Sequence, residues 1–157
     1  MTVRTTTAED EAPIIRLCER GGVFKPEEIG VVKELLGIYL RQPGQSAYQF
    51  FSADEGGAIV GFACCGPTSM TTNNFELYWI ATDKNALRGG IGSALLRAVE
   101  AEARTARRRW LNIVTSSTEP YAPARAFYER HGYAPVTRIA DYYAEGDDLI
   151  WYRKALA

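Results

Sequence analysis

The sequence has little histidine and cysteine, no long apolar run and almost no excess charge, and each shortage excludes a class of protein. With one histidine and three cysteines in 157 residues, the chain has no cluster of these residues suited to zinc. A serine–histidine–acid triad would depend on that one histidine, which is badly placed for catalysis. The 19 acidic and 18 basic residues give a net charge of -1, so no basic excess is available to bind the phosphates of nucleic acid. No apolar run approaches the roughly 20 residues of a membrane span. We expect no metal, no nucleic-acid partner and no membrane.

Simple interpretations apply to the cysteines, the N-terminal segment and the one histidine. Cys64 and Cys65 are neighbours in a predicted strand and would point to opposite faces, so they suit small core residues better than a disulfide or a nucleophile. The segment Met1–Thr5 lacks the charged and then apolar layout of a secretory signal, so we expect a cytoplasmic protein. The one histidine, His131, precedes Gly132 at a predicted helix end, where it would cap the helix.

The length and the hydrophobic pattern predict one domain, residues 1–157, of the mixed α/β (α+β) class. Periodicity and turn residues predict strands at 3–6, 48–53, 58–65, 75–82, 110–116, 133–139 and 149–154. They also predict four helices: one that starts at Thr7–Asp10 and ends at Gly21–Gly22, one that starts at Pro26, one over 92–107, and one from Pro123 to Gly132. The second helix would end at a break over residues 42–44. Residues 75–116 form a strand–helix–strand unit, which predicts two parallel neighbouring strands and a right-handed crossover.

A glycine-rich turn joins the strand and the helix of that unit. Gly89, Gly90 and Gly92 fall within four positions, directly before the predicted helix. Without Cβ atoms such a turn brings backbone N–H groups close to an anion, and the helix adds its positive dipole end. The turn matches neither the dinucleotide fingerprint, because residue 95 is leucine, nor the P-loop, because Ser93 follows Gly92 directly. It predicts a phosphate site or, alternatively, a tight structural turn.

Two segments carry a family resemblance. Trp79–Leu96, with Arg88–Leu96 at its centre, resembles the coenzyme-A-binding motif of GNAT-type N-acetyltransferases, and Ala124–Tyr133 resembles that family's later helix motif. The resemblance implies a GNAT fold with a mixed central sheet of about six to seven strands flanked by four helices. It also implies acetyl-CoA as cosubstrate.

The resemblance further assigns the coenzyme contacts. The phosphate-binding segment would comprise Leu87, Arg88, Gly89, Gly90, Ile91, Gly92 and Ser93, and the backbone of Ile80, Ala81 and Thr82 would run beside the pantetheine arm. Leu87 departs from the family, which usually has glutamine or arginine there, and Arg88 is displaced by one position. Tyr121 is a second departure, since many relatives carry an asparagine at this helix start.

Transfer of an acyl group from a thioester to an amine needs a base and an acid. Deprotonating an alkylammonium of pKa about 10.4 at pH 7 costs about 4.6 kcal/mol. Glu76 lies on the strand before the glycine turn, at the spacing of the glutamate base in related enzymes, and would accept the proton directly or through water; alternatively it faces solvent. Tyr128 is by resemblance the acid for the departing thiolate; alternatively it is a core aromatic. We expect direct transfer without an acyl-enzyme.

The acceptor is less readable. Phe24, Tyr78, Tyr142 and Tyr143 would form an aromatic wall for it, although core packing explains each equally well. We expect a primary amine of a small molecule. A protein or aminoacyl-tRNA acetyltransferase, and a non-catalytic acyl-CoA-binding sensor, stay open as alternatives. An exposed sheet edge would allow a homodimer.

Overall fold

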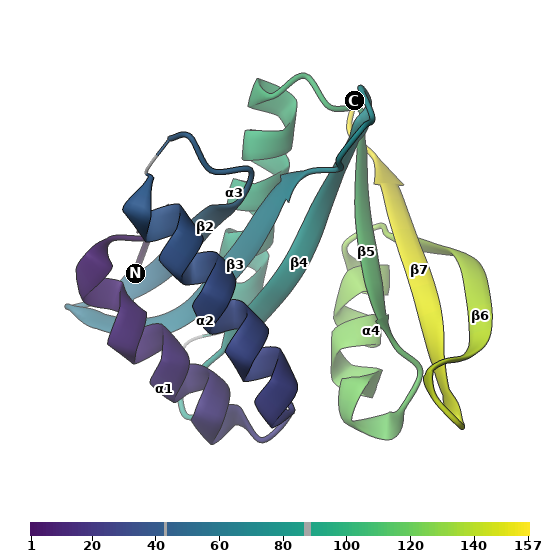
Figure 1. Cartoon of the computed structure of the whole chain (residues 1–157), viewed down its shortest axis with the longest axis horizontal. Helices are drawn as coiled ribbons and strands as arrows, with labels where there is room; N and C mark the ends of the chain where they lie inside the picture. The colour runs from purple at the N-terminus through teal and green to yellow at the C-terminus, as the bar shows by residue number, and fades with distance from the viewer. Residues whose placement is uncertain (43, 87–88) are drawn as a thin grey trace.

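The computed structural model describes residues 1–42, 44–86 and 89–157 and confirms the predicted α/β fold (Figure 1). The elements are β1 (Thr2–Thr5), η1 (Ala8–Asp10), α1 (Glu11–Gly21), α2 (Pro26–Arg41), β2 (Gln49–Glu55), β3 (Ala58–Pro67), β4 (Asn74–Thr82), α3 (Ile91–Thr105), β5 (Trp110–Ser116), η2 (Glu119–Tyr121), α4 (Ala122–Arg130), β6 (Ala134–Ala144) and β7 (Asp147–Ala155). Within the described ranges, no helix is both long and apolar enough to cross a bilayer.

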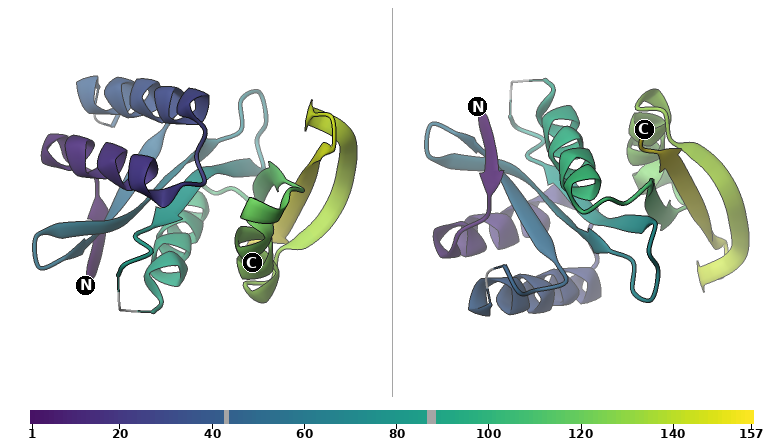
Figure 2. Two further views of the ribbon diagram at one scale, coloured as in Figure 1. Left: turned by 90° about the horizontal axis from the view of Figure 1, so that it is seen from below. Right: turned by 90° about the horizontal axis from the view of Figure 1, so that it is seen from above.

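The seven strands form one sheet in the order β1-β2-β3-β4-β5-β7-β6. β4 and β5 are parallel and are joined through α3, which confirms the strand–helix–strand unit, and the other neighbouring strands are antiparallel. α1 and α2 cover one face of the sheet and α3 covers the other (Figure 2). The result is a sheet with helices on both faces.

Two hydrophobic cores lie on the two faces. One packs α1 and α2 against the sheet around Ile14, Leu36 and Phe62, and the other packs α3 and α4 against the opposite face. Cys64 belongs to the first core and Cys65 to the second, both fully buried. Burial raises the pKa of both thiols, so both remain neutral core residues, as predicted.

β4 and β5 separate after a short stretch of pairing, and this separation positions the site. Only Asn74–Glu76 of β4 pair with Trp110–Asn112 of β5. Beyond these residues β4 continues along β3 and β5 continues along β7, so the two strands diverge (Figure 1). The remaining length of β4 therefore has a strand neighbour on one side only.

A β-bulge at Tyr78 changes which side chains β4 presents to each face. Leu77 pairs with Cys65 and Trp79 with Cys64, so Tyr78 is the extra residue. Before the bulge Leu77 packs into the α3 core, and after it Ile80 does so, while Trp79 packs on the α1–α2 side. The sequence pattern did not reveal this bulge.

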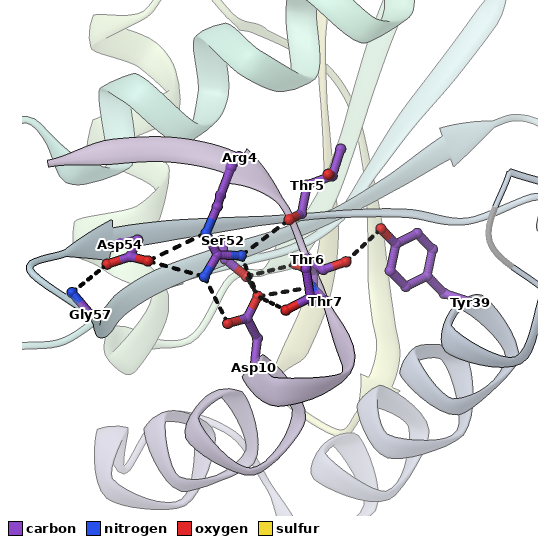
Figure 3. Close-up of polar contacts among 9 residues, drawn as sticks. All are labelled: Arg4, Thr5, Thr6, Thr7, Asp10, Tyr39, Ser52, Asp54 and Gly57. Carbon is purple, nitrogen blue, oxygen red and sulfur yellow. Dashed lines mark hydrogen bonds and ion pairs between the residues drawn. The ribbon is translucent and has the colours of Figure 1, made fainter.

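The start of the chain is fixed by a buried carboxylate (Figure 3). Asp10 accepts hydrogen bonds from both terminal nitrogens of Arg4 at 2.7 and 3.0 Å, from the Thr7 N–H at 2.9 Å and from the Ser52 hydroxyl at 3.1 Å. The Tyr39 hydroxyl donates to the Thr6 carbonyl at 2.9 Å. Thr7 and Asp10 thus begin the first helical segment, as predicted, and also tie β1 to β2.

Several predicted boundaries differ from the structure by one or more residues, and two of the differences have a clear local cause. The strand predicted at 133–139 is longer, because β6 continues to Ala144 through an irregular stretch in which Asp141 has φ +51°. Asp148 accepts the Asp141 N–H at 2.9 Å and the Asp141 side chain accepts the Gly146 N–H at 2.8 Å, which stabilises this stretch. The helix predicted over 92–107 ends at Thr105, because Arg107 adopts the left-handed region at φ +57°.

Candidate active site

Two cavities meet where β4 and β5 separate. The smaller, of about 560 Å³, lies against the N-terminus of α3, and the larger, of about 780 Å³, extends between β4, β5 and the start of α2. The two cavities share part of their lining, namely Ile80, Ala81, Thr82, Lys84, Ala124 and Tyr128. The two cavities therefore form one groove with two arms.

The smaller cavity contains the glycine turn. Gly90 caps α3 and has φ +87°, a backbone conformation that residues with a side chain rarely adopt. A Cβ on Gly92 would lie 3.3 Å from the Phe127 ring, so any side chain there would require that ring to shift by a few tenths of an ångström. The first N–H groups of α3 have no partner within the helix and carry its positive dipole end. This is an anion-binding geometry.

Cations and a hydroxyl surround these amides. Lys84, Arg130, Ser93 and His131 line the cavity with Gly89, Gly90, Ile91 and Gly92. Leu87 and Arg88, also expected to contact the coenzyme, lie outside the described residues.

His131 occupies the predicted helix end and does more than cap it. Its Nδ1 lies 2.8 Å from the Phe127 carbonyl and its Nε2 lies 2.8 Å from the Ser93 hydroxyl. Because a carbonyl only accepts, Nδ1 carries a proton and donates it to Phe127, and Nε2 shares a hydrogen bond with the Ser93 hydroxyl. The ring thus joins the end of α4 to the start of α3 at the rim of the cavity, a link that sequence spacing alone could not reveal.

The backbone of β4 forms the shared wall. Ile80, Ala81 and Thr82 pair with Ala63, Phe62 and Gly61 of β3. On the other side, no strand of the described ranges continues the ladder beyond Glu76. The backbone groups that face the groove can therefore pair with an extended ligand.

Glu76 lies at the last parallel pair between β4 and β5. It is half-buried, pairs in register with Asn112 of β5, and lines the larger cavity. Burial, and then the neighbouring Glu76 carboxylate, raise the pKa of Tyr78, so that phenol stays protonated beside it. Glu76 therefore faces the groove and not bulk solvent alone.

Tyr128 lies at the junction of the two cavities and is 6% exposed. Its ring packs against those of Phe127, Tyr133 and Tyr152, with centroids 5.8, 6.4 and 5.8 Å away. Its hydroxyl has no hydrogen-bond partner among the described residues. Burial raises its pKa, so the hydroxyl holds its proton well above neutral pH. Both interpretations of this residue thus have structural support: the ring belongs to the core and the residue lines the groove.

Three of the four predicted acceptor residues line the larger cavity. These are Phe24, Tyr78 and Tyr143. Tyr142 does not line it; it is 57% exposed and packs edge-on against Tyr143 at 5.1 Å.

Tyr121, which departs from the family pattern, contacts the opposite wall of the larger cavity. Its hydroxyl donates to the Glu28 carboxylate, with oxygen distances of 3.1 and 3.2 Å, across 93 positions of sequence. Lys25 Nζ and Asp147 Oδ2 lie 3.9 Å apart nearby. Sequence reasoning missed Glu28 and Asp147; the capping position of Glu28 and the turn position of Asp147 gave only structural signals.

No group of three or more histidine, cysteine, aspartate or glutamate side chains suited to a metal ion occurs in the described part of the chain. The described groove contains four features that could serve chemistry: the turn Gly89–Gly92 with the first amides of α3, called the cradle below; the open edge of β4; the Glu76 carboxylate; and the Tyr128 phenol.

Comparisons with known proteins bear on the family and the fold. The family model "Acetyltransferase (GNAT) domain" matches residues 46–135. A GNAT-family protein structure from Desulfovibrio desulfuricans superposes with a TM-score of 0.94 at 36% identity, covering 99% of both chains. The uncharacterized N-acetyltransferase YsnE of Bacillus subtilis is 28% identical over 67% of this chain and 68% of its own.

A more distant structure shares the fold. An aminoglycoside 6'-N-acetyltransferase complexed with coenzyme A superposes with a TM-score of 0.79 at 16% identity, covering 100% of this chain and 98% of its own. Together, the matched domain model and the superposition along nearly the whole chain show that this protein belongs to the GNAT family of N-acetyltransferases.

Proposed function

We propose that this protein transfers an acetyl group from acetyl-CoA directly to a primary amine of a small molecule. The observation that carries the proposal is the two-armed groove, in which the glycine cradle and the free edge of β4 meet the larger cavity at Tyr128. Each arm suits one substrate.

The smaller cavity fits the coenzyme. The amides at the start of α3, with Lys84 and Arg130, suit a pyrophosphate, and the unpaired edge of Ile80–Thr82 suits the amides of a pantetheine arm. The fold neighbour complexed with coenzyme A supports this choice of cosubstrate.

The chemistry assigned to the chain is two proton transfers. The amine nitrogen forms a bond to the thioester carbonyl carbon and the carbon–sulfur bond breaks. Glu76 accepts the proton of the amine, directly or through water, and Tyr128 donates a proton to the departing thiolate. The raised pKa of Tyr128 keeps that proton available at neutral pH. Transfer without an acyl-enzyme is consistent with buried, neutral Cys64 and Cys65.

The shape of the larger cavity favours a small acceptor. The contact between Tyr121 and Glu28 links η2 to α2, and it so reduces the width of the larger cavity that is available to a peptide. A volume of about 780 Å³ lies in the range of small-molecule sites. A protein or aminoacyl-tRNA acceptor is the second candidate, and a non-catalytic acyl-CoA sensor is the third.

The test is release of free coenzyme A thiol from acetyl-CoA across a panel of small amines, peptides with free N-termini and aminoacyl-tRNA. We expect turnover with small amines, lowered by about 10²-fold or more in Glu76→Gln and unchanged in Glu27→Gln, an exposed neighbour of Glu28. Turnover only with peptides or aminoacyl-tRNA would support the second candidate. Acetyl-CoA binding without turnover on any amine would support the sensor.

A further inference from the structure

The larger cavity is lined by more carboxylates than the proposed acetyl transfer needs. Glu28, Glu76 and Asp147 all line it, and the mechanism needs only Glu76. Two lysines also line it, but Lys84 is exposed and shared with the coenzyme arm, and Lys25 has a side chain 58% exposed. Glu28 and Asp147 line the larger cavity alone, so they belong to the acceptor arm.

Glu28 keeps capacity to accept further hydrogen bonds. It accepts from the Tyr121 hydroxyl and, at 3.2 Å, from the Lys25 N–H. A carboxylate offers about four acceptor positions. In the described part of the chain no lysine or arginine side chain forms an ion pair with it. Burial, and then the Glu28 charge, raise the pKa of Tyr121, so the phenol stays a donor and orients the carboxylate.

Asp147 lies close to the same phenols. It is 7% exposed and accepts from the Ser116 hydroxyl at 2.5 Å. Burial raises the pKa of Tyr143, with further contributions from Tyr142, Asp147 and Glu28, and Asp147 also contributes to the raised pKa of Tyr121. Two carboxylates and two phenol rings therefore share one end of the cavity.

The only cation paired with these carboxylates in the described residues is weakly held. Lys25 Nζ lies 3.9 Å from Asp147 Oδ2, at the limit of an ion pair, and its largely exposed side chain gains little from the contact. An incoming ammonium with three N–H donors can replace it at little cost. The aromatic rings add a cation–π surface for that group.

We propose that the acceptor is a small diamine, whose reacting amine lies at Glu76 and whose second ammonium binds Glu28 and Asp147 between Tyr121 and Tyr143. This inference rests on the proposed function, since it assigns the far end of the same acceptor arm. The same charges repel an acceptor with a carboxylate at its far end, so amino acids of equal length are disfavoured.

The test compares three probes of equal length: cadaverine, its hydroxyl analogue aminopentanol and its carboxylate analogue aminopentanoate. Binding to the coenzyme-A-loaded protein is measured by calorimetry, and acetyl transfer is measured separately by thiol release. We expect cadaverine to bind about tenfold or more tighter than aminopentanol, and aminopentanoate to bind weakest. Glu28→Gln and Asp147→Asn should each remove the preference, whereas Glu27→Gln, the same change on the outer surface of α2, should keep it.

Equal binding of the three probes, or a preference that persists in both variants, would overturn the inference. Because Asp147 is buried and bonded to Ser116, half-buried Glu28 carries the test if Asp147→Asn impairs folding. Transfer to aminopentanol with no preference for cadaverine would overturn the diamine site and leave the proposed function standing. A binding preference for cadaverine with no thiol release from any probe would overturn the proposed function and leave the diamine site standing.

Discussion

Tyr128 and Tyr152 are packed rings whose centroids lie 5.8 Å apart, and their hydroxyl groups differ in what they contact. Tyr152 donates to Glu129 Oε1 at 3.0 Å, whereas the Tyr128 hydroxyl lacks a partner among the described residues and its side chain lines both cavities. The same aromatic cluster therefore contains one hydroxyl, that of Tyr152, which forms a stabilising hydrogen bond, and one, that of Tyr128, which can donate a proton to a leaving group.

Replacing each tyrosine by phenylalanine should separate these two roles. Tyr128→Phe should lower kcat by about 10²-fold and change the free energy of unfolding by less than about 0.5 kcal/mol. Tyr152→Phe should leave kcat nearly unchanged and cost about 1 kcal/mol of stability, a fall in Tm of about 2–4 °C. Thiol-release kinetics and urea unfolding measure both effects. Unchanged kcat in Tyr128→Phe would remove it as the acid.

Asp10 is the residue at which pH should most affect folding. Burial alone would raise the pKa of its carboxyl, but hydrogen bonds from Arg4, Thr7 and Ser52 outweigh burial and hold that pKa below its ordinary value. A lowered pKa in the folded state means that the ionised carboxylate stabilises the fold above the unfolded-state pKa of about 3.9. That stability is lost as pH falls through the folded-state value.

Asp10→Asn should therefore cost about 2–3 kcal/mol near pH 7, and the difference from the wild type should shrink below about pH 4. Asp54→Asn is the matched control, since Asp54 also accepts from Arg4 but its side chain is 23% exposed, against 4% for Asp10. Its cost should be smaller. Urea unfolding at several pH values gives both numbers, and a pH-independent cost of Asp10→Asn would contradict the assignment.

At the scale of elements, the start of α3 decides whether the cradle forms. Gly90 holds φ +87°, and an added Cβ would meet no atom within 4 Å there or at Gly30, a glycine inside α2. Because Gly30 has the right-handed helical conformation, the two glycines differ in backbone conformation and not in space.

Gly90→Ala should cost about 1–2 kcal/mol and weaken binding of acetyl-CoA, because alanine resists the left-handed conformation that aims the α3 amides. Gly30→Ala, inside α2 and outside the lining of the smaller cavity, should leave acetyl-CoA binding unchanged and should not destabilise the fold. Thermal unfolding and calorimetry check the pair. Equal effects of the two substitutions would mean that the left-handed turn does not position the amides.

The elements also show where sequence reasoning works and where it stops. Local chemistry determines the end of α1 at Gly22, which has φ +73°, the end of α2 at Arg41 and the glycine cap of α3, so these boundaries were predicted to within one or two residues. Pro43, part of the predicted break after α2, lies outside the described residues. The bulge at Tyr78 depends on which β3 residue each β4 residue faces, and local periodicity carries no such information. The length of β6 depends on Asp141 and Asp148 bonding across a turn, which is likewise nonlocal.

In the whole molecule, the groove lies where β4 and β5 separate. Figure 1 shows the divergence of the two strands. The resemblance to the family predicted that Glu76, the glycine turn and Tyr128 serve one site, and residue spacing alone left the role of each open. The sequence could not predict that Tyr121 would contact Glu28 or that Asp147 would line the cavity, because these contacts join segments distant in sequence. β6 is an exposed edge strand, and the homodimer, like the cytoplasmic location, stays a prediction.

The cradle at the start of α3 is the proposed binding site for acetyl-CoA, in the arm that leads to Tyr128. Isothermal titration of the protein with acetyl-CoA, beside a Gly90→Glu variant, tests this site. We expect micromolar binding by the wild type and its loss in the variant, since a glutamate there is strained at φ +87° and places a negative charge beside the amides. No binding by the wild type, or equal binding by both proteins, would mean that the cradle is not the coenzyme site.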